Sequence, residues 1–221
     1  MSVEEWNIHY KDLKFNNLIG SGSTCKVYRG VYKNLDVAIK KITGIQSADK
    51  MKFMKEFKRE ISVLVSLPTH SSLLTLIGFS IHEDDVCLVT EYCQGGTLFD
   101  ILYKKFVPFK LSYAQKLKML IDVAKGMQFL NELKKPIIHR DLKSLNIIVD
   151  RPIEKHSLNF TAKIADFGLA RTFYNISEHA TKFMGTYHWM APEIFEKDNA
   201  EPYTTKSDVY AFSIIMWETF A

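Results

Sequence analysis

The sequence predicts an α+β protein in which a β-rich first part is followed by a mainly helical second part. Short β-branched runs alternate with Gly and Asn turns over roughly the first forty residues. After residue 112, apolar residues recur at helical spacings instead. The pair Gly95-Gly96 interrupts the chain between these patterns, so we place the candidate boundary there.

The first part contains several short strands. The expected pieces are Leu18-Ile19, Val27-Tyr28, Val31-Tyr32 and Val37-Ala38-Ile39. Two further strands are expected at Leu73–Phe79 and Val86–Thr90, with Glu83-Asp84-Asp85 as the turn between them.

Two long helices are expected. One covers about residues 47–67 and ends before Pro68, because Met54, Phe57, Ile61 and Leu64 fall at spacings of three and four. The other begins at Ser112, which forms a capping-box pattern with Gln115, and ends before Pro136. Its expected buried stripe is Leu117, Leu120, Ile121, Ala124, Met127 and Leu130.

Composition excludes several classes of protein. The chain has 221 residues, 47% hydrophobic and 24% charged, as in a folded soluble protein of one or two domains. The net charge is +4, and the basic residues are scattered along the chain rather than clustered, which argues against a nucleic-acid partner. Three cysteines show neither metal spacing nor a disulfide framework, so we expect a reducing, cytoplasmic location. The most apolar stretch, residues 63–81, contains Pro68, His70 and Gly78 and is not a membrane span.

A glycine loop, Gly20–Cys25, lies between two expected strands. Glycines let backbone N–H groups approach phosphates closely, although an ordinary hairpin turn explains the loop about as well. A dinucleotide site would need a following helix and an acidic residue about 20 positions later. Val27-Tyr28 continues as strand instead, and the residues at that distance, Lys40 and Lys41, are basic.

Lys40 ends the apolar strand Val37–Ile39. A lone lysine there is most often solvated, but its place after the glycine loop would let it reach phosphates. A carboxylate must then orient it, and we prefer Glu60 to Glu56 because the inward apolar residue Leu64 lies one turn beyond Glu60. For either glutamate the alternative is an exposed helix charge.

The run Ile137–Val149 places charged residues between apolar pairs. Asp141, Lys143 and Asn146 offer a base, a cation and a neutral metal ligand on one loop. A second carboxylate, Asp166, follows at the end of another apolar segment and precedes Phe167-Gly168. These groups suit phosphoryl transfer.

In this order, the segments resemble the protein kinase signature set: glycine loop, V-A-I-K, helix glutamate, H-R-D-L-x-x-x-N, D-F-G and A-P-E. The resemblance extends from about Leu13 to Ala221. Gly185–Glu193 and Ser207–Ser213 are similar to the tyrosine-kinase-like group of Ser/Thr kinases, which includes mixed-lineage, Raf-like and plant receptor-like kinases. The resemblance implies a bilobal fold with a small β-rich lobe, residues 13–93, and a larger helical lobe, residues 94–221.

The resemblance also implies an ATP and Mg²⁺ site. Asp141 would be the catalytic base, Lys143 would steady the γ-phosphate, and Asn146 and Asp166 would bind Mg²⁺. Lys40, paired with Glu60, would hold the α- and β-phosphates. Four residues would stack between the lobes, anchored by Asp208: Leu64, Leu76, Phe167 and His139. The other residues that would bind ATP are Ile19, Gly20, Ser21, Gly22, Val27, Ala38, Thr90, Glu91, Cys93, Asp100 and Ile148.

Protein substrates and regulation follow from the same resemblance. Lys143 and Thr186 favour Ser/Thr hydroxyls over Tyr. The segment 166–193 carries Thr172, Tyr174, Ser177 and Thr181. We expect an upstream kinase or autophosphorylation to modify Thr181 or Ser177 and to order the segment against Arg140. The alternative, equally good for any single hydroxyl, is that it only keeps an exposed loop hydrated.

The sequence departs from the family pattern in three places. Cys25 replaces the third glycine of the loop, where packing is a more common role than redox chemistry. Residues 150–161 form an enlarged hairpin turn away from the site. The family fold continues with further helices beyond the helix that starts near Ser207, so we expect this chain alone to show poorly cooperative thermal unfolding. The alternative function is a truncated, weakly active kinase-like module that binds nucleotide or partners.

Overall fold

The computed structural model describes residues 3–22, 25–42, 50–83, 85–104, 106–166, 187–194 and 203–221. These residues divide into two compact units. The first contains the described residues up to Thr69 together with Thr75–Tyr92. The second contains His70–Leu74 and the described residues from Cys93 onward.

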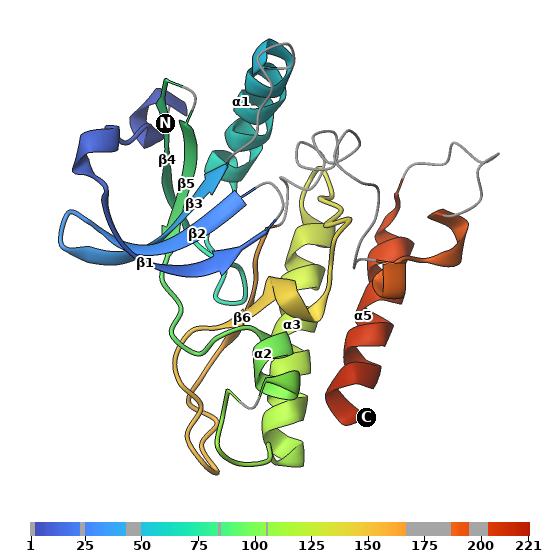
Figure 1. The fold of residues 1–221 in the computed structure, drawn as a ribbon. Helices are drawn as coiled ribbons and strands as arrows, with labels where there is room; N and C mark the ends of the chain where they lie inside the picture. Colours follow the sequence, from blue (N-terminus) through green and yellow to red (C-terminus); the bar gives the residue numbers. More distant parts are fainter. Residues whose placement is uncertain are drawn as a thin grey trace. The chain divides into compact units, whose positions relative to one another are not determined.

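The first unit is built on one antiparallel sheet of five strands in the order β1-β2-β3-β5-β4 (Figure 1). Its elements are η1 Val3–Trp6, η2 Tyr10–Asp12, β1 Lys14–Ser21, β2 Cys25–Tyr32, β3 Leu35–Ile42, α1 Lys50–Ser66, β4 Leu76–His82 and β5 Asp85–Glu91. The sheet and the N-terminal segment share a core of Ile8, Leu13, Val37, Ile39, Cys87 and Val89. The β-rich first part that the sequence predicts is therefore confirmed.

Turn chemistry explains how the first three strands pair. Lys33 and Asn34 join β2 to β3 with φ values of 47° and 65°, the left-handed pair that a tight hairpin requires. The two pieces expected at Val27-Tyr28 and Val31-Tyr32 are one continuous strand, β2. The glycine loop joins β1 to β2 as a hairpin, with the Gly22 N–H donating to the Cys25 carbonyl at 2.8 Å. The loop is followed by a strand, β2, whereas a dinucleotide site would need a helix there.

Helix α1 packs on the sheet through aromatic rings. Phe57 and Ile61 are fully buried, as the stripe predicts. The Phe57 ring meets Phe79 of β4 edge-on, with centroids 6.0 Å apart, and stacks on Phe53 at 5.8 Å. Met54 is only half-buried, because Phe53 takes the inward position instead.

The strand expected at Leu73–Phe79 begins later than predicted. Strand β4 starts at Leu76, and Leu73 forms a bridge with Ile164 in the second unit. The Leu74 N–H donates to the Ile164 carbonyl at 2.9 Å, and the Ile164 N–H donates to the Ser72 carbonyl at 2.8 Å. The start of this apolar run therefore pairs with Ile164, and the rest belongs to β4. Composition does not reveal this division.

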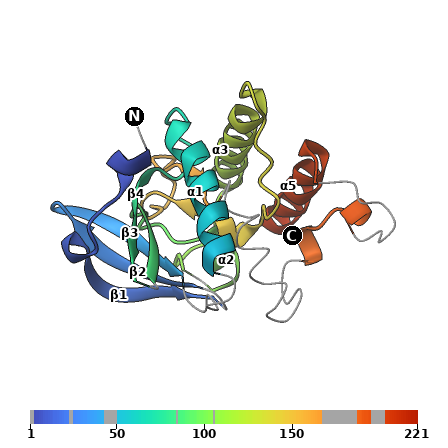
Figure 2. The ribbon, with the colours of Figure 1, turned by 90° about the horizontal axis from the view of Figure 1, so that it is seen from above.

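The second unit is mainly helical. Its elements are α2 Leu98–Tyr103, α3 Tyr113–Glu132, η3 Ser144–Asn146, β6 Ile147–Val149, β7 Ala162–Ile164, η4 Tyr187–Trp189, η5 Pro192–Ile194 and α5 Thr205–Phe220. Strands β6 and β7 form an antiparallel pair, and α3 packs against β7. Helices α3 and α5 lie side by side, which can be followed in both views (Figures 1 and 2).

Helix α3 begins as predicted but buries a different face. The Ser112 hydroxyl accepts from the Gln115 backbone N–H at 3.2 Å, and the side-chain Oε1 of Gln115 accepts from the Ser112 N–H at 3.0 Å. Leu120, Met127 and Leu130 are buried as expected, but Leu117, Ile121 and Ala124 are exposed. The buried face instead includes Met119 and Val123. Apolar residues occupy both faces of this helix, so periodicity alone could not choose between them.

The backbone of α3 approaches β7 closely at Gly126. A Cβ on Gly126 would lie 2.8 Å from Ile164 and 2.9 Å from the Ser72 carbonyl, so only glycine allows this packing. The enlarged turn of residues 150–161 is also held on α3. The buried Gln115 amide donates to the carbonyls of Glu154 at 2.9 Å and Ser157 at 3.0 Å.

Candidate active site

A buried carboxylate of α5 holds the loop that contains Asp141. The two Asp208 oxygens accept the backbone N–H groups of His139 at 2.7 Å and Arg140 at 3.0 Å. Arg140 has a φ of 67°, a left-handed conformation that a non-glycine residue keeps only when its surroundings enforce it. Burial raises the pKa of the Asp208 carboxyl, and the His139 and Arg140 groups offset this only in part. Asp208 thus holds the backbone at His139 and Arg140. The stacking of His139 with Leu64, Leu76 and Phe167 stays a prediction.

The His139 ring fixes the start of the loop from the inside. The ring is fully buried, and its Nδ1 accepts the Asp141 N–H at 3.3 Å. An amide N–H can only donate, so Nε2 carries the ring proton and donates to the Ala165 carbonyl at 2.9 Å. His139 therefore links Asp141 to the residue that precedes Asp166.

The side chains of Lys143 and Asn146 converge at Asp141. Lys143 Nζ lies 2.9 and 2.7 Å from the two carboxylate oxygens, and both side chains keep partial exposure, 15% for Lys143 and 33% for Asp141. Asn146 Nδ2 donates to the Asp141 carbonyl at 2.7 Å and to its carboxylate at 3.2 Å. The predicted base, cation and neutral ligand therefore lie together.

Asn146 and Asp166 provide oxygen atoms suited to a hard cation. Because Asn146 Nδ2 is committed to Asp141, the amide oxygen is the atom left for a metal ion. The Asn146 carbonyl accepts the Ala165 N–H at 2.8 Å, which ties the loop to the residue before Asp166. Asp166 itself has a φ of 60°. An amide oxygen and a carboxylate are ligands that Mg²⁺ uses together with phosphate oxygens, so the residues fit this ion.

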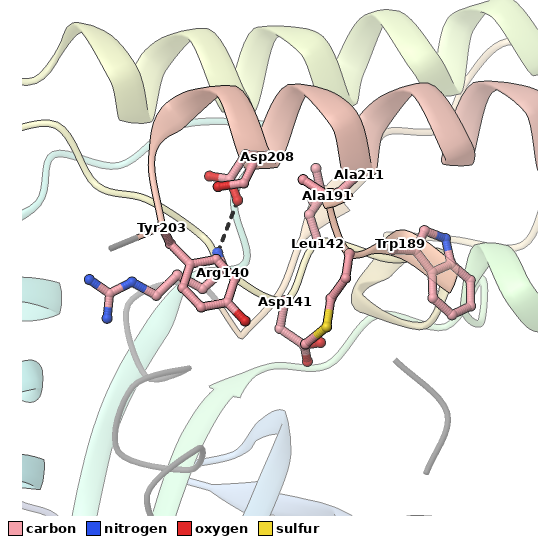
Figure 3. A pocket seen from close by; sticks show the side chains of 10 residues that line it. Arg140, Asp141, Leu142, Trp189, Ala191, Tyr203, Asp208 and Ala211 are labelled. Atoms are coloured by element: carbon pink, nitrogen blue, oxygen red, sulfur yellow. Dashed lines mark hydrogen bonds between the residues drawn. The ribbon is translucent and has the colours of Figure 1, made fainter. Parts of the chain in front are cut away.

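A small pocket opens beside Asp141 (Figure 3). One wall is the loop Arg140, Asp141 and Leu142, and the other is the segment 189–191. Helix α5 contributes Asp208 and Ala211. The Arg140 side chain points away from Asp208, whose bond is to the Arg140 backbone (Figure 3).

The first unit carries the other predicted polar residues. Lys40 lies on β3, opposite Val27 of β2 and Leu88 of β5, and is half-buried. Glu60 lies on α1 and is half-buried, whereas the Glu56 side chain lies outside the described part. The pairing of Lys40 with Glu60 stays a prediction.

The predicted nucleotide contacts fall on both units. Ile19, Gly20 and Ser21 are on β1, Val27 is on β2, Ala38 is on β3, Thr90 and Glu91 end β5, and Ile148 is on β6. Gly22 and Cys93 are in connecting segments. The Thr90 hydroxyl donates to the Glu91 carbonyl at 3.2 Å. The Glu91 carboxylate accepts the Thr75 N–H at 2.8 Å, so its side chain holds the chain where β5 ends.

Asp100 has a structural role in addition to the ribose contact predicted for it. Its carboxylate accepts the Thr97 hydroxyl at 2.7 Å in a capping box at the start of α2, and pairs with Lys104 Nζ at 2.9 Å. Burial acts to raise the pKa of Asp100, but the bonds from Lys104 and Thr97 outweigh it and lower the pKa. Capping alone is therefore enough to explain this carboxylate.

Several predicted residues lie outside the described part of the chain. They are Ser23 and Thr24 of the glycine loop and Phe167, Thr172, Tyr174, Ser177, Thr181 and Thr186 of the segment 166–193. Phosphorylation of Thr181 or Ser177 stays a prediction.

Sequence reasoning missed Glu218 as a member of this region. Glu218 is buried in the last turn of α5 and accepts bonds from Trp189 and Ser144, which flank the pocket and the loop. One signal was available, because a carboxylate in the last turn of a helix opposes the helix dipole and therefore needs another reason to be there.

No helix in the part of the chain that the structure describes is long and apolar enough to cross a lipid bilayer.

Comparison with known proteins gives one family and many relatives. Residues 13–221 match the family described as protein tyrosine and serine/threonine kinase. A Dictyostelium discoideum protein named as a probable serine/threonine-protein kinase is 41% identical over 96% of this chain and 19% of its own length. Serine/threonine-protein kinase STY46 of Arabidopsis thaliana is 37% identical over 98% of this chain and 34% of its own length. The Drosophila melanogaster mitogen-activated protein kinase kinase kinase is 37% identical over 98% of this chain and 18% of its own length.

The chain thus spans about a third or less of the curated relatives that it matches. These relatives agree with the tyrosine-kinase-like group expected from the sequence.

Proposed function

Because the chain belongs to the protein tyrosine and serine/threonine kinase family, we propose that it transfers the γ-phosphoryl group of ATP to Ser or Thr hydroxyls of protein substrates. The relatives named as serine/threonine-protein kinases support this choice of hydroxyl. Lys143, two residues after Asp141, supports it as well.

The observation that carries the proposal is the arrangement around Asp141. One carboxylate accepts bonds from Lys143 Nζ and Asn146 Nδ2 while keeping a third of its side chain exposed toward the surroundings. It can therefore accept a proton from a substrate hydroxyl without first losing its orientation. Phosphoryl transfer depends mainly on such positioning and on charge neutralisation.

In the proposed mechanism, Asp141 orients the hydroxyl and takes its proton as the new P–O bond forms and the bond to the leaving ADP oxygen breaks. Lys143 places a positive charge beside the transferred group. The loop keeps this geometry because Asp208 and the His139 ring accept three of its backbone N–H groups. Proton transfer to a positioned carboxylate contributes about 10²–10⁴-fold to rate in enzymes.

We assign Mg²⁺ and ATP to the residues that the sequence predicts for them. Asn146 and Asp166 would hold the ion, which supplies positive charge at the phosphates when it is bound. In the first unit, Lys40 oriented by Glu60 would hold the α- and β-phosphates, with the glycine loop above them. We assign the adenine and ribose to the remaining predicted residues, and we treat residues 13–93 and 94–221 as the small and large lobes.

Transfer of radiolabelled phosphate tests the proposal. The full-length protein is incubated with labelled ATP, Mg²⁺ and Ser/Thr peptides, and the labelled amino acid is identified. We expect phosphoserine or phosphothreonine from the wild-type protein and none from Lys40→Met. Nucleotide binding without any transfer would instead favour the weakly active binding module.

A further inference from the structure

The guanidinium group of Arg29 lies over the ring of Tyr92 in the first unit. The guanidinium carbon is 5.0 Å from the centroid of the ring, which is within the range of a cation–π contact. Arg29 lies in the middle of β2, and Tyr92 directly follows β5. The contact therefore joins the interior of one strand to the end of another across β3, which lies between them in the sheet (Figure 1).

Strand register places this contact beside residues that are predicted to bind the nucleotide. Arg29 is paired with Ala38 of β3, and Ala38 is paired with Thr90 of β5. Paired residues in an antiparallel sheet share a face, and so do residues two apart on one strand. Arg29 therefore lies on the same face as Val27, Ala38 and Thr90, all three of which are predicted to bind ATP. Tyr92 lies two positions beyond Thr90, where β5 has ended.

A carboxylate of β3 helps to orient the arginine. Arg29 Nη2 donates to Asp36 Oδ2 at 2.9 Å, but the two side chains are 42% and 43% exposed, so this ion pair alone adds little stability. Within the part of the chain that the structure describes, the Arg29 Nε atom is buried and has no hydrogen-bond partner. A side chain that turned toward water would avoid this cost. The Tyr92 ring and Asp36 therefore set the position of Arg29 together.

The end of β5 is also held on its other side. The Glu91 N–H donates to the Thr75 carbonyl at 3.0 Å, and the Thr75 N–H donates to the Glu91 carboxylate at 2.8 Å. Thr75 directly precedes β4, which pairs with β5 on the side away from β3. Contacts from both sides thus hold the chain at Glu91 and Tyr92. Glu91 and Cys93, the neighbours of Tyr92, are both predicted to bind ATP.

We propose that Arg29 is a positioning residue for the nucleotide base: by holding the Tyr92 ring, it fixes the main chain at Glu91 and Cys93, where the adenine would bind. This inference rests on the use of ATP in the proposed function. It assigns Arg29 to the base rather than to the phosphates, because its contact is with the chain that follows β5. Loss of the contact should weaken binding of adenosine and of ADP by the same factor, since both carry the same base. Use of the peptide substrate should not change.

Nucleotide binding by the full-length protein tests this assignment. The variants are Arg29→Ala, Arg29→Lys, Tyr92→Leu, Tyr92→Phe and the double variant Arg29→Ala/Tyr92→Leu. Calorimetry gives Kd for adenosine and for ADP with Mg²⁺, and KM is measured for a Ser/Thr peptide that the wild-type protein phosphorylates. Lys33→Gln is the matched control, because Lys33 Nζ lies 5.2 Å from the centroid of the Tyr32 ring, which is a contact of the same kind at the turn between β2 and β3.

We expect Arg29→Ala and Tyr92→Leu each to raise both Kd values by about two- to fivefold, which is the size of one partly exposed cation–π contact. The KM for the peptide should stay at the wild-type value. Tyr92→Phe keeps a ring under the guanidinium group and should bind as the wild type does. Arg29→Lys keeps a cation over the ring and should recover part of the loss. The double variant should bind no more weakly than the single variants, because both changes remove the same contact.

Other outcomes would overturn the inference. They are unchanged Kd values in Arg29→Ala and Tyr92→Leu, a rise for ADP without a rise for adenosine, additive effects in the double variant, or an equal defect in Lys33→Gln. If Tyr92→Leu does not fold, the two Arg29 variants and Tyr92→Phe decide by the same criteria.

The wild-type protein separates this inference from the proposed function. A wild-type protein that binds adenosine and ADP but transfers no phosphate would overturn the proposed function alone, and the Kd values of the variants would still decide the inference. An active wild-type protein with insensitive variants would overturn the inference alone. A wild-type protein that binds neither adenosine nor ADP would overturn both.

Discussion

Replacement of Asp208 by Asn tests whether the α5 carboxylate sets the geometry of the Asp141 loop. The change is nearly isosteric, but an amide has only one oxygen. Asp208 now accepts N–H groups from His139 at 2.7 Å and Arg140 at 3.0 Å. In Asp208→Asn the new NH₂ group would face one of these donors, so one buried N–H loses its acceptor.

The magnitude follows from that lost bond. An orphaned buried donor costs about 1–3 kcal/mol. A neutral amide is cheaper to bury than a carboxylate whose pKa burial already raises, which offsets part of this cost. We expect a net loss of about 2 kcal/mol, which corresponds to a decrease in Tm of about 4–8 °C for a chain of this size. Arg140 can then relax from its φ of 67°, which would displace Asp141.

Thermal unfolding and phosphate transfer are measured together on the full-length protein. We expect kcat to fall by at least about tenfold, because Asp141 is the next residue after Arg140 and rate is sensitive to placement. Asp122→Asn is the matched control. Asp122 is also a buried carboxylate, and it accepts the Ala162 N–H at 3.0 Å and pairs with Lys118, away from the Asp141 loop. Equal Tm losses with wild-type kcat in both variants would refute the anchoring argument.

Three further predictions concern stability and reactivity. The lowered pKa of Asp100 means that its ionised form stabilises the protein above the usual Asp value of 3.8, and that this contribution is lost as pH falls through the lowered pKa. The Tm difference between wild type and Asp100→Asn should therefore be largest near neutral pH and disappear at low pH; a constant difference would contradict this. Burial, helped by the Asp85 charge, raises the pKa of Cys87 to about 12, so iodoacetamide at pH 8 should modify Cys93 before Cys87, as read by mass spectrometry. Early labelling of Cys87 would show that β5 opens. Gln115→Ala should cost about 2 kcal/mol of stability and speed proteolysis within residues 150–161, because two carbonyls of that turn lose their donor; unchanged proteolysis would show that the turn is held elsewhere.

The residues around Asp141 could be predicted because they are contiguous in sequence. Asp141, Lys143 and Asn146 lie on one short loop, so their meeting needed no knowledge of distant contacts. The same holds for the start of α3, where Ser112 and Gln115 interact locally. A site formed by residues that are close in sequence can therefore be predicted from the sequence.

Features that depend on distant neighbours could not be predicted in this way. Leu117 and Ile121 have the same character as Leu120, yet only the last is buried, because burial depends on which face of α3 meets β7. Leu73 leaves its expected strand because Ile164, far along the chain, offers a bridge. Glu218 belongs to no motif, and its bonds reach residues 29 to 115 positions away.

The catalytic role of Asp141 is the central claim, and comparison of wild type with Asp141→Asn tests it most directly. Nucleotide binding, Tm and the rate of phosphate transfer are measured on the same preparations of full-length protein. We expect unchanged nucleotide binding and a transfer rate lower by about 10²–10⁴-fold, the usual contribution of a positioned general base. A transfer rate equal to that of the wild type would contradict the account.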